Sequence, residues 1–241
     1  MSDPLAPLLD LEGVAAAVKS AQEAVFAVHR HPVNLRGAAA TAAEASVRAA
    51  RASAAIEGAD PEIPADAAVT DPVLAGALRV AEALEPLLPT WRRAPWQALA
   101  RMHVLAAADL TEDLNALGRP QAGTAARLEL LARFVTGGTS VPGVVLTAVV
   151  HGELMAVRPF GLADGVVARA AARLTMVATG VDPKSLTVPE VAYLRQARRY
   201  REAVERFASG EPAGVRDWLL FSCETLRKGA REARGIAEAA G

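Results

Sequence analysis

The spacing of apolar residues near the N-terminus most constrains what this chain can fold into. Apolar residues recur there at intervals of three or four, at Leu11, Val14, Val18, Ala21, Val25 and Val28. An α-helix turns once in about 3.6 residues, so this spacing places the side chains on one face. We therefore expect a long amphipathic helix. His31-Pro32 ends it, because the residue before a proline is pushed out of helical conformation, and Asn34 to Gly37 is predicted as a turn.

Similar segments, separated by proline and glycine, follow along the chain. The predicted helices span Gly37 to Ile56, Val73 to Leu88, Pro95 to Leu110, Ala125 to Val135, Val144 to Val157, Thr187 to Ser209 and Val215 to Glu238. Pro89 bounds the helix that begins at Val73, and Thr187 to Glu190 has the spacing of a capping box. Residues 58–72 and 115–124 are predicted as loops.

Composition agrees with an all-α fold. Hydrophobic residues make up 52% of the sequence but aromatic residues only 4%. The apolar share is dominated by Ala, Leu and Val rather than by the residues that strands favour. The length of 241 residues suits one large domain or a domain with a helical extension.

Charge and hydropathy exclude several classes of protein. Lys and Arg number 26 against 27 Asp and Glu, a net charge of -1, so no overall field attracts nucleic acid or an anionic membrane. No uninterrupted apolar run approaches the ~18 residues that span a bilayer, and the N-terminus lacks a basic segment followed by an apolar one. We therefore expect a cytoplasmic protein with neither nucleic acid nor membrane as its partner.

The cysteine and histidines give little indication of chemistry. Cys223 lies in an apolar run and is expected to be a small buried hydrophobe. His29 and His31 have no acidic or cysteine neighbour in the sequence, which favours ordinary surface residues over metal ligands. His103 is expected to be a packed or surface residue of its helix.

One segment carries more information. From Val157 to Arg169 the chain has a Pro-Phe loop, then small residues, then an amphipathic helix. A glycine-containing turn that leads into a helix leaves backbone N–H groups free, and the helix N-terminus adds partial positive charge. This geometry favours an anion, although any loop before a helix shares it.

The segment resembles the signature of the Fic family, His-Pro-Phe-x-x-Gly-Asn-Gly-Arg-x-x-Arg, whose members typically move AMP from ATP onto a protein hydroxyl. The matching residues are Pro159, Phe160, Gly165 and Arg169, and Ala163 is a near match. His151 resembles the family's lead-in to the motif. Arg199-Tyr200 and Asp217 to Phe221 resemble segments of its closing helices.

A second match lies about a hundred residues earlier. Ser53 to Gly58 fits the family's inhibitory motif, Ser/Thr-x-x-x-Glu-Gly/Asn, although alone it could be a helix that ends at a glycine. The two matches together imply an all-α Fic (fido) helical fold over residues 40–222. The implied organisation is an N-terminal helical region with an inhibitory helix, residues 1–72, and a Fic-like domain, residues 73–241.

The resemblance also implies roles for individual residues. Arg158 occupies the catalytic histidine's position. The implied nucleotide-binding residues are Phe160, Ala163, Asp164, Gly165 and Arg169, and the implied inhibitory residues are Ser53, Glu57 and Gly58.

Several of these positions depart from the family pattern. The guanidinium of Arg158 has no acceptor lone pair and cannot serve as a general base. Leu162 replaces the acidic residue that binds magnesium, and an aliphatic chain offers no oxygen to a hard cation, so no metal site is expected. Val166 replaces the first motif arginine, which in the family grips the γ-phosphate and pairs with the inhibitory glutamate.

Two further expectations concern charge near the motif. Asp164 replaces an asparagine, and a carboxylate ~4 Å from a phosphate would cost about 4 kcal/mol at an effective dielectric constant of ~20. Because Val166 leaves Glu57 without the family's partner, we expect Arg158 to bridge to Glu57, Asp164 or both.

The loop from Gly118 to Gly123 is too short and polar for the family's target-docking hairpin.

Three functions remain open. The first is a catalytically inactive relative of the AMP-transferases that acts as a regulatory or partner-binding module. The second is a nucleotidyl or phosphoryl-group transferase that uses Arg158 electrostatically. The third is an unrelated helical interaction protein with chance matches. No cofactor is certain, binding of ATP with Mg²⁺ is expected to be weakened, and the partner is an unidentified protein or a second copy of the chain.

Overall fold

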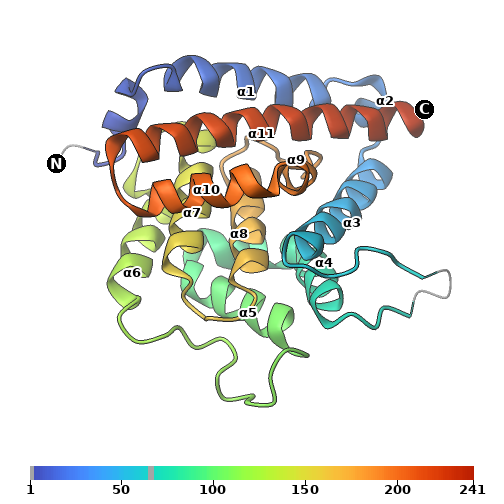
Figure 1. Cartoon of the computed structure of the whole chain (residues 1–241). Coiled ribbons are helices and arrows are strands. Elements are labelled where there is room, and N and C mark those ends of the chain that lie inside the picture. The colour runs from blue at the N-terminus through green and yellow to red at the C-terminus, as the bar shows by residue number, and fades with distance from the viewer. Residues whose placement is uncertain (1–2, 65–67) are drawn as a thin grey trace.

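The computed structural model describes residues 3–64 and 68–241, and every regular element in these ranges is helical (Figure 1). A 3₁₀ turn, η1, precedes the α-helices and a π turn, η2, lies among them. The bounds are η1 Ala6–Asp10, α1 Val14–His29, α2 Pro32–Arg36, α3 Ala39–Ile56, α4 Pro72–Arg93, α5 Pro95–Ala107, α6 Ala125–Arg133, η2 Phe134–Gly138, α7 Gly143–Val157, α8 Asp164–Ala178, α9 Pro189–Arg195, α10 Ala197–Ala208 and α11 Pro212–Ala239. None of the helices in these ranges is long and apolar enough to cross a membrane.

The centre of the molecule is the pair α7 and α8, which pack against each other. Helix α8 is buried from Asp164 to Met176, and α7 buries residues on all sides. A helix that is apolar all round needs neighbours on every side. Helices α4 and α5 pack on α8, while α10 and α11 cover α7. The loop between these two helices is therefore anchored at both ends by the core, and it is partly exposed, with Pro159 and Phe160 buried and Arg158 and Leu162 exposed.

The two ends of the chain form one side of the molecule. Helix α1, blue in Figure 1, runs beside the long red helix α11. The face of α1 predicted from the sequence is buried, at Val14, Val18, Ala21, Val25 and Val28. Helix α3 packs on both α4 and α9, which brings its C-terminal end towards the central pair.

The prediction of a turn at residues 34–37 was wrong, because Pro32–Arg36 form α2. Proline suits the first position of a helix, where the missing N–H has no partner to lose. Asn34 is buried and fixes this short helix. Its Nδ2 donates to the Val28 carbonyl at 2.9 Å, and its Oδ1 accepts from the Thr41 hydroxyl at 2.7 Å.

The predicted end of a helix at Pro89 was also wrong, since α4 continues through Pro86 and Pro89 to Arg93. A proline inside a helix removes one hydrogen bond and crowds the preceding turn. Trp91 lies beyond both prolines and is completely buried. Burial of this side chain favours the extra helical turn strongly enough to outweigh the local cost.

The predicted capping box at Thr187 is absent. The Thr187 hydroxyl donates to Asp182 Oδ2 at 2.7 Å, and Arg173 Nη2 donates to Glu190 at 3.0 Å. Both side chains that would form the box are therefore engaged elsewhere. The helix begins at Pro189 and divides at Gln196 into α9 and α10.

His29 is not the partnerless surface residue that the sequence suggested. Its Nε2 lies 2.8 Å from Asp182 Oδ1, and its side chain is 14% exposed. The two residues are 153 positions apart, so inspection of the neighbouring sequence could not pair them. Cys223, in contrast, is buried as expected, and burial raises the pKa of its thiol to about 12.

Residues 58–64 and 68–71 connect α3 to α4 without regular structure, as predicted, while residues 65–67 of that predicted loop lie outside the described residues. The division of the chain at residue 72 stays a prediction.

Candidate functional site

The candidate site is the loop from Arg158 to Ala163, which joins α7 to α8. Arg158 ends α7 with a φ of 47°, and Ala163 precedes α8 with a φ of 52°, both in the left-handed region. Such conformations are unfavourable for residues with a Cβ and persist where the surroundings enforce them. The small side chain of Ala163 limits this cost where the chain enters α8.

Phe160 packs the loop against α5. Its ring stacks on His103 of α5, with centroids 4.2 Å apart and an interplanar angle of 6°. His103 Nδ1 accepts from the Gly118 N–H at 2.9 Å, and burial lowers the pKa of His103. The imidazole is therefore neutral with its proton on Nε2. His103 is a packed residue, as one reading of the sequence expected.

The α5–α6 connection, residues 108–124, contains no strand and lies against the candidate loop. The Gln121 N–H donates to the Pro159 carbonyl at 2.7 Å. A Cβ on Gly161 would lie 2.5 Å from the Gln121 amide nitrogen, so the side chain of Gln121 lies directly over this glycine. Backbone and side chain of one residue thus hold the two loops together.

Asp164 closes the loop at the N-terminus of α8. Its Oδ1 accepts from the Phe160 N–H at 2.9 Å, while its buried Oδ2 has no hydrogen-bond partner. Burial raises the pKa of Asp164, although the backbone amides of Phe160 and Gly161 and the charge of Arg158 act in the opposite direction. The negative charge at this position is therefore less favourable than in water.

Arg169 lies further along α8 and is 2% exposed. Its Nε donates to the Ser53 hydroxyl at 2.8 Å, and its Nη2 donates to the Ser53 carbonyl at 3.0 Å and to Glu57 Oε1 at 2.7 Å. Nη1 reaches the Tyr200 hydroxyl at 3.4 Å. Burial lowers the pKa of Arg169, but Tyr200 and Glu57 more than compensate, and its pKa is raised. The structure thus brings Ser53, Glu57 and Arg169 together.

The carboxylate of Glu57 occupies the start of α8. A Cβ built on Gly165 would lie 2.1 Å from Glu57 Oε1 and 3.1 Å from Arg169 Nη1. The carboxylate therefore lies directly on the first turn of α8, where backbone N–H groups and the helix dipole favour negative charge. Gly58 follows Glu57 with a φ of 93°.

The expected bridge from Arg158 to Glu57 or Asp164 was wrong. Arg158 is exposed and makes no ion pair with either carboxylate, both of which the structure describes. Glu57 is paired instead with Arg169, because the end of α3 lies beside the second motif arginine. Val166 occupies the position of the first arginine in the family's signature. It is 3% exposed and packs in the main core.

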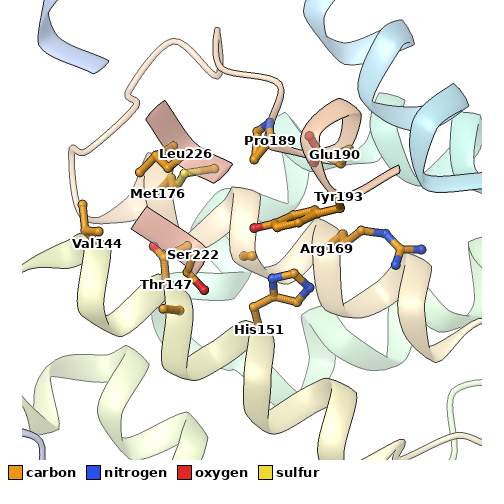
Figure 2. Close-up of a pocket in the computed structure, with 12 residues that line it drawn as sticks. Val144, Thr147, His151, Arg169, Met176, Pro189, Glu190, Tyr193, Ser222 and Leu226 are labelled. Carbon is orange, nitrogen blue, oxygen red and sulfur yellow. The ribbon is translucent and has the colours of Figure 1, made fainter. Parts of the chain in front are cut away.

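A buried polar cluster that the sequence did not predict lies beside Arg169. His151 Nε2 lies 2.8 Å from the Tyr200 hydroxyl, and the rings of Tyr193 and Tyr200 stack with centroids 4.8 Å apart. Burial, and then the charge of Arg169, lower the pKa of His151 to about 3. Figure 2 shows His151, Arg169 and Tyr193 around an internal cavity of about 20 Å³. The signal available in the sequence was that His151 and Tyr200 both lie in segments that resemble the Fic family.

Among the described residues, no group of three or more His, Cys, Asp or Glu side chains could hold a metal ion. Leu162 is 41% exposed at the loop surface.

No protein-family model matches the sequence, and no curated protein matches it. Among solved structures, the chain is similar to a Fic family protein from Desulfovibrio desulfuricans G20. The TM-score is 0.70, the sequence identity is 16%, and the match covers 93% of this chain and 74% of the other. This likeness confirms the predicted all-α Fic fold.

Proposed function

We propose that this Fic-fold chain is a catalytically inactive relative of the protein AMP-transferases, and that it acts as a regulatory or partner-binding module. The observation that carries the proposal is the position of Glu57. Its carboxylate lies on Gly165 and pairs with Arg169, so the chain's own anion fills the place that a nucleotide phosphate would need.

The site also lacks a candidate base where the resemblance would require one. The guanidinium of Arg158 cannot accept a proton at neutral pH. His103 and His151 do not replace it, because His103 accepts from the Gly118 N–H and His151 is buried against Tyr200. General-base catalysis commonly contributes ~10² to 10⁴-fold, so its loss removes much of the activity.

Magnesium-assisted binding of ATP is weakened for a separate reason. Leu162 supplies no oxygen ligand, and Val166 is buried where the resemblance places a phosphate-binding arginine. Any remaining nucleotide affinity depends on the N-terminus of α8 and on Arg169 after Glu57 has moved away.

Exposed apolar residues near the motif support a role in binding a protein partner. Leu162 lies in the candidate loop, and Leu114, which is 71% exposed, lies in the α5–α6 connection fastened to it. A partner that covers these two side chains would remove apolar surface from water, which favours association at this loop.

Incubation with ATP labelled at the α-phosphate, in the presence of Mg²⁺, tests the proposal. We expect no labelling of the chain or of lysate proteins by the wild type or by Glu57→Gly, which removes the internal anion. The same two proteins are titrated with ATP by calorimetry, and we expect Glu57→Gly to bind more tightly than the wild type. Labelling by Glu57→Gly would show an inhibited enzyme instead of an inactive one.

A transferase that uses Arg158 is the second candidate. The observation in its favour is that Arg158 is exposed beside the loop and makes no ion pair with Glu57 or Asp164. It is therefore available to a ligand phosphate. Labelling by the wild type that disappears in Arg158→Ala would support this candidate and overturn the first.

A further inference from the structure

A separate cavity lies between α3, α4, α8 and residues 183–185, and its volume is about 510 Å³. Small residues of α3, including Ala42 and Ala43, form one wall, and Leu88, Leu174 and Val177 supply apolar surface on the other sides. Pockets of roughly 300 to 1,000 Å³ with mainly apolar lining are typical of small-molecule sites.

The charged groups of this cavity are unequally paired. Both cations are engaged within the protein. Arg173 donates to the Ser185 hydroxyl at 2.8 Å and to Glu190 at 3.0 Å, and Lys184 Nζ donates to the Asn34 carbonyl at 2.9 Å.

The two carboxylates of the cavity are in the opposite situation. Glu82 and Glu85 of α4 are exposed and have no hydrogen bond or ion pair with any described residue. Because they are three residues apart on a helix, they lie on the same face. The cavity therefore combines apolar surface with two carboxylates that form no ion pair with the described residues.

We propose that this cavity binds a small molecule that has an apolar body and one cationic amine or guanidinium group. The apolar body fills the space between the alanines of α3 and the aliphatic residues of α4 and α8. The cationic group lies at the rim, where Glu82 and Glu85 supply charge-assisted hydrogen bonds.

The cavity is distinct from the Glu57–Arg169 site. Its α3 residues begin at Ala39 and end at Ser46, while Glu57 follows the far end of the same helix. Eleven residues of helix correspond to roughly 16 Å, so the proposal does not depend on the proposed function.

A fluorescence titration with dansylcadaverine, which joins an aromatic body to a primary ammonium group, tests the proposal. We expect saturable binding with a blue shift of the emission. The N-acetylated form of the same probe, which differs in carrying no charge, should bind at least tenfold more weakly. Equal affinity for the two probes, or no saturable binding, would overturn the proposal.

Two variants locate the probe. Glu82→Gln/Glu85→Gln should weaken dansylcadaverine binding at least tenfold. Glu112→Gln/Glu129→Gln changes the net charge equally at exposed positions outside the cavity and should leave it unchanged. Ala42→Phe, which fills the cavity, should abolish binding while the circular dichroism spectrum stays that of the wild type. If either cavity variant binds dansylcadaverine as tightly as the wild type, the proposed site is wrong. If Ala42→Phe loses helicity, the Glu82→Gln/Glu85→Gln variant alone decides the test.

Discussion

Asp164 and Arg169 lie on the same helix and are both buried, yet burial affects them differently. One oxygen of Asp164 has no hydrogen-bond partner, and its pKa is raised because burial disfavours the charge. Arg169 has Ser53, Tyr200 and Glu57 as partners, and its charge is retained. The number of partners, rather than depth alone, decides which charge the protein stabilises.

Asp164→Asn is expected to change how stability depends on pH. A raised pKa in the folded state means that the unfolded chain loses the Asp164 proton first as the pH rises. The wild type therefore loses stability relative to Asp164→Asn as the pH increases from below the ordinary aspartate value of about 4 towards neutrality. Urea unfolding of both proteins between pH 3.5 and 7, values chosen to span that range, measures the difference.

Asp10→Asn serves as the control for this comparison, because Asp10 is exposed. Asp10→Asn removes the same charge at the surface, so a pH dependence that only Asp164→Asn shows reflects the buried position of Asp164. Parallel profiles for Asp164→Asn and the wild type would show that burial does not disfavour the Asp164 charge.

At the scale of helices, sequence pattern was informative wherever one face of a helix is buried. The three-and-four spacing identified α1 and its buried face. It was less informative at α4, where burial of Trp91 favours a continuous helix through two prolines. Local propensity carries no information about such a tertiary contact. Thr187 and Glu190 failed to cap a helix for the same reason, since Asp182 and Arg173 compete for them.

The candidate site shows the same limit. The motifs predicted Ser53, Glu57 and Arg169 as site residues; the structure shows that the three are in contact, and their role stays a prediction. The sequence did not reveal which charge would pair with Glu57. Arg169 and Glu57 are 112 residues apart, and their contact depends on how α3 packs beside α8. Arg158 was the wrong choice because it lies at the exposed end of α7.

The contact between α4 and α5 depends on Gly76. A Cβ at this position would lie 2.2 Å from the Ala106 carbonyl oxygen, which is backbone and cannot turn aside. Gly76→Ala should therefore destabilise the fold by about 2 to 4 kcal/mol, as overpacking forces the two helices apart. Chemical denaturation measures this loss.

Gly235→Ala is the matched control on α11, since no atom lies within 4 Å of the added Cβ. There the substitution should stabilise the protein by about 0.5 to 1 kcal/mol, the helix propensity difference between alanine and glycine. Equal effects of the two substitutions would show that the α4–α5 contact adjusts without cost.

Over the whole molecule, Asp182 joins segments that are far apart in sequence. It is completely buried, between α8 and α9, and accepts from the Leu186 and Thr187 N–H groups and from His29 of α1. Burial raises its pKa, but the hydrogen bonds from His29 and from the backbone of Thr187 and Leu186 outweigh this, and the pKa is lowered. Asp182 thereby fixes the first helix to the centre of the fold.

Asp182→Ala should destabilise the protein by about 2 to 5 kcal/mol at pH 7, a neutral value, because four donors lose their acceptor. A lowered pKa means that this contribution is present above the ordinary aspartate value and is lost as the pH falls through the folded-state value. The difference between wild type and variant should therefore shrink in acid, and guanidinium unfolding at neutral and acidic pH measures it. A difference that is constant with pH would contradict this reasoning.

Under the proposed function, Glu57 is an anion tethered to the chain, so it would compete with every external anion at a fixed local concentration. An incoming anion binds only the fraction of molecules in which the carboxylate has left Gly165 and Arg169, and its affinity is reduced by that fraction. A carboxylate in place 99% of the time would lower affinity about 100-fold, whether the anion is inorganic phosphate, ADP or ATP. Glu57→Gly should then increase the affinity for all three by one common factor, measurable by calorimetry, and unequal factors would mean that Glu57 itself distinguishes among them. Any preference for one anion must therefore come from the residues that remain in the site. Glu57 sets only the binding free energy that each anion has to exceed.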